Sequence, residues 1–349
     1  AARSAFAVRR DMASFDASLS AAGNLAMAAS GRYRFKAGTG QADIDLKSLR
    51  FGPMFMSFMR LVPNAAAVDL RAGTASGKAR LSWNGRDVGG TATVAVKGLE
   101  MSDETTGTEI EGLNAQIHLD RLMPAQTPPG QILRIRRIAA GTDLTALTLR
   151  FSLESTPASV YPRLRIEGFD AGFIGGRLSV RPTVLDPVSG ENRVAIDLTD
   201  VNLTALFALI GVEGVSGEGR LGGVIPVRQV GAAVDISGGR LAAAGPGTLR
   251  IRSAAVKRAL AQGGKEVALM LSALEDFRYD SLTIDIDKKP QGDGRIRLKT
   301  DGHNPAVLDG RSFRININIS GNVDRIAAVV AHALKLPAAV VRSIVPKAK

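Results

Sequence analysis

Apolar and polar residues alternate along most of the chain. The clearest run is 313–320, in which Phe313, Ile315, Ile317 and Ile319 alternate with polar residues. Successive side chains of a β-strand point to opposite faces, so this pattern predicts a strand with one apolar and one polar face. Similar runs, each bounded by glycine or Asn-Gly, follow one another from the N-terminus onward. The chain is therefore predicted to be mainly β, with antiparallel strands.

Glycines and prolines predict where the strands are interrupted. Asn84-Gly85 is the strongest hairpin signal in the chain. Gly31, Gly38 and Gly40 are predicted to lie in turns that separate strands of the N-terminal region. The proline-rich segment 123–131 is predicted to be a loop.

Helical periodicity is confined to three stretches. Residues 203–211 could form two turns after Asn202 as N-cap, and residues 253–276 and 323–349 contain apolar residues at helical spacing. Residues 53–63, with three Met and two Phe between prolines, predict a short helix that caps the sheet. The alternative is a flexible lid over an apolar channel, because Met adapts to irregular partners.

So few helices raise the question of what covers the apolar face of the strands. Three short helices are too few to cover the apolar faces of about fifteen predicted strands. The sheet therefore either folds on itself as a sandwich or curls into an open trough. A trough would be wide enough for acyl chains, each buried CH₂ of which contributes about 0.8 kcal/mol. Composition alone favours neither arrangement.

The chain is strongly basic, with 45 Lys and Arg against 33 Asp and Glu. The basic residues are spread over alternate strand positions, as in 133–138 and 294–299, and form no dense cluster. Aromatic residues make up only 5% of the chain, too few for a base-stacking surface. These features argue against nucleic acid as a partner. They favour a solvated polar face, with a weaker preference for anionic lipid headgroups.

Cysteine and membrane-spanning segments are both missing from the sequence. The absence of cysteine excludes disulfides and thiolate metal sites. No run of 18 uninterrupted apolar residues occurs, so no membrane-spanning helix is predicted. No signal peptide is recognisable and the sequence begins with Ala1, which suggests a fragment from which the targeting segment was removed.

Two glycine motifs resemble nucleotide-binding sequences only superficially. Gly217-x-Gly219-x-x-Gly222 satisfies the dinucleotide pattern, but the following residues predict a strand instead of the helix that the pyrophosphate requires. These glycines are predicted to serve a tight turn or a bulge. The segment 73–79 has one spacer too few for a phosphate loop and lacks the Ser or Thr that would hold magnesium.

No catalytic or metal-binding constellation is predicted. His118, His303 and His332 are isolated in sequence, and no nucleophile motif accompanies them. Acidic residues spaced by two could in principle bind calcium on one face of a strand. A solvated polar face explains them equally well, because their neighbours along the strand are apolar. These pairs are Asp43/Asp45, Glu109/Glu111 and Asp285/Asp287.

Several separated motifs occur in the order found in one known family. They are TPPGQILRIRRIAAGTDLTALTLRF (127–151), EGVSGEGRLGGVIPV (213–227), ISGGRLAAAGPGTLRIRS (236–253), LEDFRYDSLTIDID (274–287) and HNPAVLDGRSFRININI (303–319). With these motifs, Thr127–Asn322 resembles the C-terminal part of the YdbH family, bacterial envelope proteins related to AsmA. Residues 1–126 share the texture of the family without a quotable motif.

This resemblance implies a fold and a function. The expected fold is mainly β, an elongated, curved antiparallel sheet that forms an open, half-pipe-like groove, with a few short helices including one near the C-terminus. The expected function is a periplasm-spanning bridge that shields phospholipid acyl chains between the inner and outer membranes and supports outer-membrane lipid homeostasis. No catalytic activity, cofactor or metal is expected. The alternative is a soluble β-sandwich scaffold or adhesion module without lipid cargo.

The resemblance also implies a location and partners. The protein is expected in the periplasm of a Gram-negative bacterium, held by an N-terminal inner-membrane anchor that this chain lacks. Besides phospholipid, the expected partner is a small outer-membrane lipoprotein of the YnbE type that extends the sheet. Such pairing needs an exposed strand edge. The candidate edge is the last clear strand, with Phe313, Arg314, Ile315, Asn316, Ile317, Asn318 and Ile319. A helix over residues 323–345 could instead cover it.

By the same analogy, the expected groove is divided along the chain and lined by apolar residues. Residues 1–192 are expected to form a repetitive β-groove segment, 193–322 a C-terminal YdbH-like β-groove segment, and 323–349 an amphipathic helical tail. A charge introduced at Ile284 should block lipid passage in an open groove but unfold a closed core. The expected lining residues are Leu178, Val180, Ile196, Leu198, Val234, Ile236, Leu249, Ile251, Leu282, Ile284, Ile286, Ile296, Leu298, Ile315 and Ile317.

Overall fold

The structure is a computed structural model of the chain. It describes residues 1–21, 25–53, 68–85, 87–103, 107–156, 159–210, 214–231, 233–252, 269, 272–289 and 294–321. Twenty strands belong to one sheet, and all the strand pairs described below are antiparallel. Within the described residues, the first strand pairs only with the second and the last strand only with the one before it, so the sheet is open. The prediction of a mainly β, open antiparallel sheet with few helices is confirmed.

The strands fall into two compact units. Unit 1 contains Ala1–Phe169 and Pro182–Ser189, and unit 2 contains Asp170–Arg181 and the described part of Gly190–Ala333. The division into segments 1–192, 193–322 and 323–349 stays a proposal.

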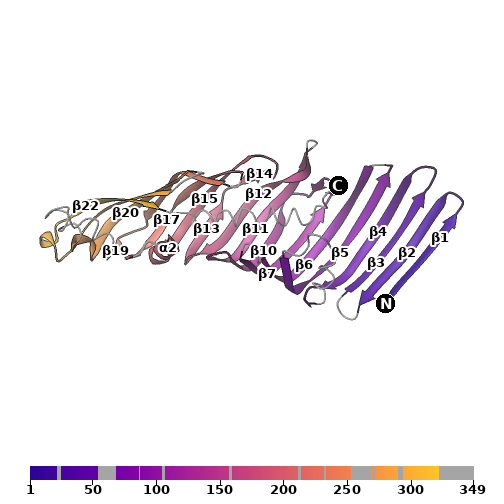
Figure 1. The fold of residues 1–349 in the computed structure, drawn as a ribbon, viewed down its shortest axis with the longest axis horizontal. Helices are drawn as coiled ribbons and strands as arrows, with labels where there is room; N and C mark the ends of the chain where they lie inside the picture. Colours follow the sequence, from indigo (N-terminus) through magenta and orange to yellow (C-terminus); the bar gives the residue numbers. More distant parts are fainter. Residues whose placement is uncertain are drawn as a thin grey trace. The chain divides into compact units, whose positions relative to one another are not determined.

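Unit 1 is built around long antiparallel hairpins. In order, β1 to β7 and then β10 and β11 each pair with the next, and β12 pairs with β14. Figure 1 shows β1–β7 side by side, coloured from indigo to purple. The strands are β1 (Ala2–Arg9), β2 (Met12–Ala21), β3 (Leu25–Arg34), β4 (Thr39–Arg50), β5 (Val68–Asn84), β6 (Asp87–Asp103), β7 (Thr108–Leu119), β8 (Arg121–Leu122), β9 (Ala125–Gln126), β10 (Gln131–Ala139), β11 (Asp143–Thr156), β12 (Ser159–Phe173) and β14 (Thr183–Leu185).

Two of the predicted turn glycines lie inside strands instead. Asn84 and Gly85 do form the β5–β6 hairpin, and Gly38 lies in the β3–β4 turn with φ of 64°. Gly31 lies within β3, where an added Cβ would be 2.3 Å from the ring of Phe15 on the neighbouring strand.

An aromatic ring also lies against the backbone at the second of these glycines, Gly40. Gly40 lies within β4, where an added Cβ would be 2.2 Å from the ring of Trp83. The turn prediction for Gly31 and Gly40 was wrong because glycine also serves where a neighbouring aromatic ring lies against the backbone.

Irregularities in register are concentrated across the middle of unit 1. The β4–β5, β5–β6 and β6–β7 pairs each contain shifts of register. Gly73, Gly98 and Gly112 have φ of 113°, 58° and 67° in the middle of β5, β6 and β7. Bulges bend a strand and increase its local twist, and glycine is the residue that adopts positive φ without strain. The sheet of unit 1 is therefore bent where these strands lie side by side.

Unit 2 repeats the meander with shorter strands. The pairing order is β13, β15, β17, β18, β20, β21 and β22, while β16 pairs with β19 and β19 with β20. The strands are β13 (Gly176–Val180), β15 (Glu191–Asn202), β16 (Val215–Glu218), β17 (Arg220–Val230), β18 (Ala233–Ala243), β19 (Gly247–Ile251), β20 (Phe277–Lys288), β21 (Gly294–His303) and β22 (Phe313–Gly321).

One helix of unit 2 forms as predicted. α2 (Leu203–Ile210) directly follows β15, and the Asn202 side-chain oxygen accepts a hydrogen bond from the Ala205 amide at 2.9 Å. This bond satisfies one of the free amides at the helix start. Leu203, Leu206 and Phe207 are buried. Elsewhere in unit 2, Leu308–Gly310 form a single 3₁₀ turn (η1).

The dinucleotide-like motif is a break between two strands. Gly217 lies in β16 and Gly222 in β17, while Gly219, with φ of 150°, separates the two strands. The Tyr279 hydroxyl donates a hydrogen bond to the Glu218 carbonyl at 2.9 Å, and a Cβ on Gly219 would be 1.9 Å from that hydroxyl. Burial raises the pKa of Tyr279. The motif continues into strand β17, as predicted, instead of the helix that a pyrophosphate-binding turn requires.

Three predicted segments lie wholly or largely outside the described residues. They are the possible cap or lid at 53–63 and the helices predicted at 253–276 and 323–349. Of the second, residues 272–274 are described and are helical.

The bend of unit 1 gives a first testable prediction. A Cβ on Gly73 would lie 2.7 Å from Leu99 Cα and 2.9 Å from the Gly98 carbonyl oxygen, and φ is 113°. Gly73→Ala should therefore lower the free energy of unfolding by about 1–3 kcal/mol. Gly168 is the matched control, because a Cβ there has no neighbour within 4 Å. Urea unfolding of both variants measures the difference, and equal stability would contradict a steric requirement at Gly73.

Candidate functional site: the apolar face of the sheet

In unit 1, a row of small residues crosses six strands on one face. Residues of this row lie directly opposite one another in β1 to β6. All but one are Ser or Ala. We call this the small-residue row: Ser4, Ala17, Ala29, Ile44, Ala79 and Ala92.

Larger apolar side chains flank the small-residue row on the same face. Two positions toward the β1–β2 turn, the residues in register include Phe6, Phe15 and Leu81. Two positions the other way, they include Leu19, Met27, Leu46 and Val94. Because small side chains lie between larger ones, the surface of this face is lower along the small-residue row, which runs across the strands. This face, from β1 to β11, is the apolar face of unit 1.

The apolar face of unit 1 is exposed over its first strands and buried over its last ones. On β1, the side chains of Phe6 and Val8 are 71% and 56% exposed, and Val94 on β6 is 37% exposed. By contrast, Leu119 of β7 and Leu149 of β11 are each only 4% exposed. Covering apolar surface contributes about 25 cal/mol per Å², so the exposed strands would be stabilised by an apolar ligand.

Unit 2 also has an apolar row in continuous register. Seven residues lie opposite one another from β13 to β22, and five of them are predicted lining residues, whereas Leu241 and Gly223 were not predicted. The row is Leu178, Leu198, Gly223, Leu241, Ile284, Leu298 and Ile317. Glycine stands at position 223 of this row because a Cβ there would be only 2.0 Å from the Arg240 carbonyl oxygen.

The predicted lining residues of unit 2 are covered by protein. Ile317 is half-buried, and every other predicted lining residue is buried, with exposed fractions from 0% at Leu249 and Ile286 to 9% at Val234. Ile284 is 1% exposed. A carboxylate introduced there would be buried without a partner, which is strongly destabilising. Ile284→Asp therefore tests stability, and a transport test needs a more exposed position.

The predicted edge strand, residues 313–319, lies within β22. β22 pairs with β21 along its whole length, and within the described residues no strand pairs with its other side. Arg314, Asn316 and Asn318 are exposed while Ile315 is buried, so the predicted alternation is confirmed. The Phe313 ring lies 5.3 Å from that of Phe277. The helix expected at 323–345 lies outside the described residues.

The exposed part of the apolar face, on β1 to β6, is not conspicuous in the sequence pattern and was not predicted. Every predicted lining residue lies between Leu178 and Ile317, where Ile, Leu and Val make the alternation conspicuous. In β2 to β6 the same face is built largely from Ala, which gives a weak hydrophobic signal. The alternation of Ala92, Val94 and Val96 with polar residues in 91–97, interrupted only by Ala95, could have indicated it.

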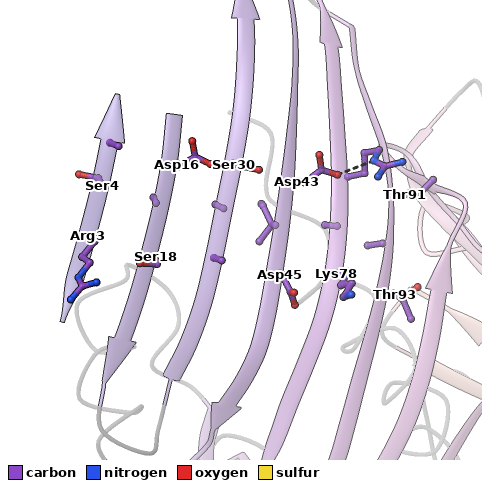
Figure 2. Close-up of a pocket in the computed structure, with 18 of the residues that line it drawn as sticks. Arg3, Ser4, Asp16, Ser18, Ser30, Asp43, Asp45, Lys78, Thr91 and Thr93 are labelled. Carbon is purple, nitrogen blue, oxygen red and sulfur yellow. Dashed lines mark hydrogen bonds and ion pairs between the residues drawn. The ribbon is translucent and has the colours of Figure 1, made fainter. Parts of the chain in front are cut away.

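A hollow of about 770 Å³ crosses β1 to β7 in unit 1. Figure 2 shows its labelled residues on neighbouring strands. Three acidic and three basic side chains line it, so their charges balance, and Arg80 donates a hydrogen bond to Asp43 at 2.8 Å. The lining therefore has no excess charge that would attract an ionic ligand. The charged residues are Arg3, Asp16, Asp43, Asp45, Lys78 and Arg80.

His118 also borders this hollow. Its Nδ1 lies 3.0 Å from Thr93 Oγ1 and its Nε2 lies 3.2 Å from Asp120 Oδ1. The imidazole therefore has a hydroxyl beside one ring nitrogen and a carboxylate beside the other. In the described residues, no three His, Cys, Asp or Glu side chains come together as metal ligands.

Cross-strand ion pairs occupy the polar faces of the strands. Glu111 pairs with Arg137 at 2.9 Å, and Asp287 pairs with Arg297 at 3.0 Å. One member of each predicted acidic pair, namely Asp43, Glu111 and Asp287, is thus paired with an arginine from a neighbouring strand, as expected for a solvated polar face.

A bidentate pair in unit 2 joins Arg181, the residue after β13, to Asp197 of β15. Arg181 Nε and a terminal nitrogen lie 2.8 and 2.7 Å from the two oxygens of Asp197. These charge-assisted hydrogen bonds lower the pKa of Asp197, while partial burial acts in the opposite direction. Similarly, the hydrogen bond from Arg314 lowers the pKa of Asp301.

The fold and this site together define a class of protein: an open antiparallel sheet with an extended, partly exposed apolar face. Within the described part of the chain, no helix is both long and apolar enough to cross a membrane.

Comparison with known families agrees with this class. The YdbH-like family, described as intermembrane phospholipid transport protein YdbH, matches residues 5–325. The chain belongs to this family. It is a family of lipid-transport proteins and not of enzymes, which supports a general role in lipid transport in the cell envelope. Searches of curated proteins and of solved structures gave no significant match.

The Arg181–Asp197 pair gives a prediction for pH dependence. Because the folded-state pKa of Asp197 lies below its ordinary value of about 3.9, the pair stabilises the fold above that pH. The contribution is lost as the pH falls through the folded-state pKa. Arg181→Gln should raise the pKa of Asp197 toward its ordinary value, as measured by NMR titration of the carboxyl carbon. Arg240→Gln should leave it unchanged, and an equal response to both substitutions would contradict a specific pair.

Proposed function

We propose that this chain is a segment of a periplasm-spanning bridge that carries phospholipids between the inner and outer membranes. The observation that carries the proposal is the register of the apolar face, which stays in line over many strands within each unit. An uninterrupted apolar row gives acyl chains a path across the strands without burying polar groups. Membership of an intermembrane phospholipid transport family supports this reading.

The exposed strands of unit 1 are the proposed entry to this path. Their small-residue row leaves room for a chain between taller side chains, and Phe6 and Val8 are exposed to receive it. Each CH₂ that moves from water onto such a surface contributes up to about 0.8 kcal/mol. A few methylenes therefore offset the cost of ordering the lipid.

In unit 2 we propose that the buried row is a separate stretch of lipid-binding surface. Here acyl chains would have to separate side chains that are packed in the present structure. The proposed lining comprises Leu178, Val180, Ile196, Leu198, Val234, Ile236, Leu249, Ile251, Leu282, Ile284, Ile286, Ile296, Leu298, Ile315 and Ile317.

The burial of this row favours a second candidate function. A closed apolar core is what a scaffold or adhesion module of the envelope would have, and such a module would carry no lipid. The two functions differ in whether phospholipid accompanies the purified protein.

We further propose that the full-length protein is anchored in the inner membrane of a Gram-negative bacterium and meets a YnbE-type outer-membrane lipoprotein at β22. An edge strand with free backbone groups is the feature such pairing requires.

A charge on the apolar face tests the lipid path. Ala17→Asp places a carboxylate in the small-residue row at a partly exposed position. A charged group in a hydrocarbon environment costs about 2.5–3.5 kcal/mol, so bound phospholipid should fall several-fold. Mass spectrometry of lipid extracted from the purified protein measures this loss.

Ser18→Asp is the matched control for this substitution. Ser18 is the next residue of β2, points to the polar face and is exposed. It should retain the lipid, and circular dichroism should show both variants folded. Wild-type protein that carries no phospholipid would favour the scaffold, and equal loss in both variants would contradict a path along the apolar face.

Cross-linking tests the proposed edge pairing. Since the chain contains no cysteine, Asn316→Cys or Asn318→Cys introduces a unique thiol on an exposed position of β22. Each should form a disulfide in the periplasm with cysteines placed at alternate positions along a strand of the lipoprotein, because side chains on one face of a sheet recur every second residue. Ser18→Cys should not. Absence of cross-links at β22 would refute this edge as the site of contact.

A further inference from the structure

The turns at one end of unit 1 form a continuous rim. Because β1 to β6 form a meander, the β1–β2, β3–β4 and β5–β6 turns lie at the same end of the strands. The Lys36 amide donates to Asp11 Oδ1 at 2.7 Å, and the Gly85 amide donates to the Gly38 carbonyl at 3.0 Å. The Phe35 amide also donates to the Asp11 carbonyl at 2.9 Å, so hydrogen bonds from backbone amides join the three turns into one structure.

This rim carries an excess of positive charge. Its described residues include Arg9, Arg10, Arg34 and Lys36, all exposed, against only two acidic residues, Asp11 and Asp87. Asp11 already accepts the hydrogen bond from the Lys36 amide. None of the four cations forms an ion pair within the described residues, whereas Arg80, Arg137 and Arg181 of the strands all do. We call these four residues and their turns the basic rim.

The opposite end of the same strands differs in charge. There Arg71 pairs with Asp69 at 3.5 Å and with Glu109 at 3.4 Å. Its other described charged residues include Arg50 and Asp103. With Arg3, at the start of β1, three described basic side chains stand against three acidic ones at that end, so the excess of positive side chains occurs at the basic rim.

Aromatic side chains lie directly below the basic rim. The Tyr33 and Trp83 rings stack at 6.4 Å, and the Phe35 ring, 49% exposed, meets Tyr33 edge-on at 5.4 Å. Phe6 and Phe15 continue the row on the same face. Tyr and Trp combine an apolar ring with a polar group, which suits the boundary between lipid headgroups and acyl chains.

The distances fit a single phospholipid. From Arg10 in the turn to Ser4 in the small-residue row is a separation of six residues along β1, or about 20 Å at roughly 3.3 Å per residue. The hydrocarbon layer of one leaflet is about 15 Å thick, half of the ~30 Å bilayer core. Phe6 lies four residues from Arg10, or about 13 Å at the same rise. An acyl chain whose headgroup stays in water at the rim therefore covers Val8 and Phe6 and ends about 5 Å short of the small-residue row.

We propose that the basic rim binds the headgroups of phospholipids whose acyl chains lie on the apolar face, and that it selects headgroups with a net negative charge. This inference rests on the proposed lipid path. Cations at a lipid surface each favour an anionic headgroup by up to about fivefold in affinity. Zwitterionic lipids gain less, because their own cationic group opposes the rim.

A competition between two lipids tests the selection. Purified protein, first stripped of lipid, is mixed with vesicles that contain equal amounts of phosphatidylglycerol and phosphatidylethanolamine and is then separated from them. Mass spectrometry of the lipid that accompanies the protein should show several-fold more phosphatidylglycerol. About 1 M salt should reduce the ratio, because it shortens the Debye length to roughly 3 Å.

Two quadruple variants with the same change in charge separate the rim from the overall charge of the protein. The rim variant combines Arg9→Gln, Arg10→Gln, Arg34→Gln and Lys36→Gln, and should take up both lipids equally. The control variant combines Lys47→Gln, Arg50→Gln, Lys97→Gln and Arg150→Gln, exposed positions away from the rim and outside the hollow, and should keep the preference.

The outcomes distinguish this inference from the proposed function. Equal uptake of both lipids by the wild type, an unchanged preference in the rim variant, or equal loss in both variants would overturn the headgroup selection while leaving lipid binding intact. Binding of the protein to the vesicle surface without any uptake would also overturn it. If no variant takes up either lipid, the lipid path itself fails.

Discussion

Cross-strand register is the constraint on which this structure depends. A shift by one residue between two neighbours would move every apolar side chain of a strand to the polar face. The small-residue row of unit 1 and the row from Leu178 to Ile317 in unit 2 both stay in register from strand to strand, so no such change of face occurs along them. Where the register does shift, as between Leu46 and Leu49, bulges absorb the change and the apolar side is kept. Backbone pairing thus determines which side of the sheet can meet an apolar ligand.

Glycine maintains this register in two physically different ways. Gly73 and Gly98 adopt backbone angles that bend the strands. Gly31 and Gly40 instead leave room for the rings of Phe15 and Trp83, which lie over the backbone of the next strand. A sheet with few aromatic residues can in this way keep large side chains close to its surface.

Charge is distributed differently over the two faces and the two ends of unit 1. Ion pairs between neighbouring strands neutralise much of the polar face, and each exposed pair contributes little to stability. The basic rim, in contrast, keeps its cations free of carboxylate partners within the described residues. A protein that handles phospholipids needs both an apolar surface and a place for the headgroup, and in unit 1 the two are adjacent.

Much of this architecture could be predicted from the amino-acid sequence. Alternation identified the strands, Asn84-Gly85 the hairpin and Asn202 the start of a helix, because each is a local effect of side-chain direction or hydrogen bonding. The sequence motifs show the family resemblance over residues 127–322, and the family model matches the longer range 5–325. The roles of Gly31 and Gly40 were not predictable, since they depend on rings brought close by a neighbouring strand. Likewise, only the tertiary structure shows that Ile284 is buried while Phe6 is exposed. Burial and the gathering of distant turns into one rim depend on strand pairing, and local sequence pattern does not specify them.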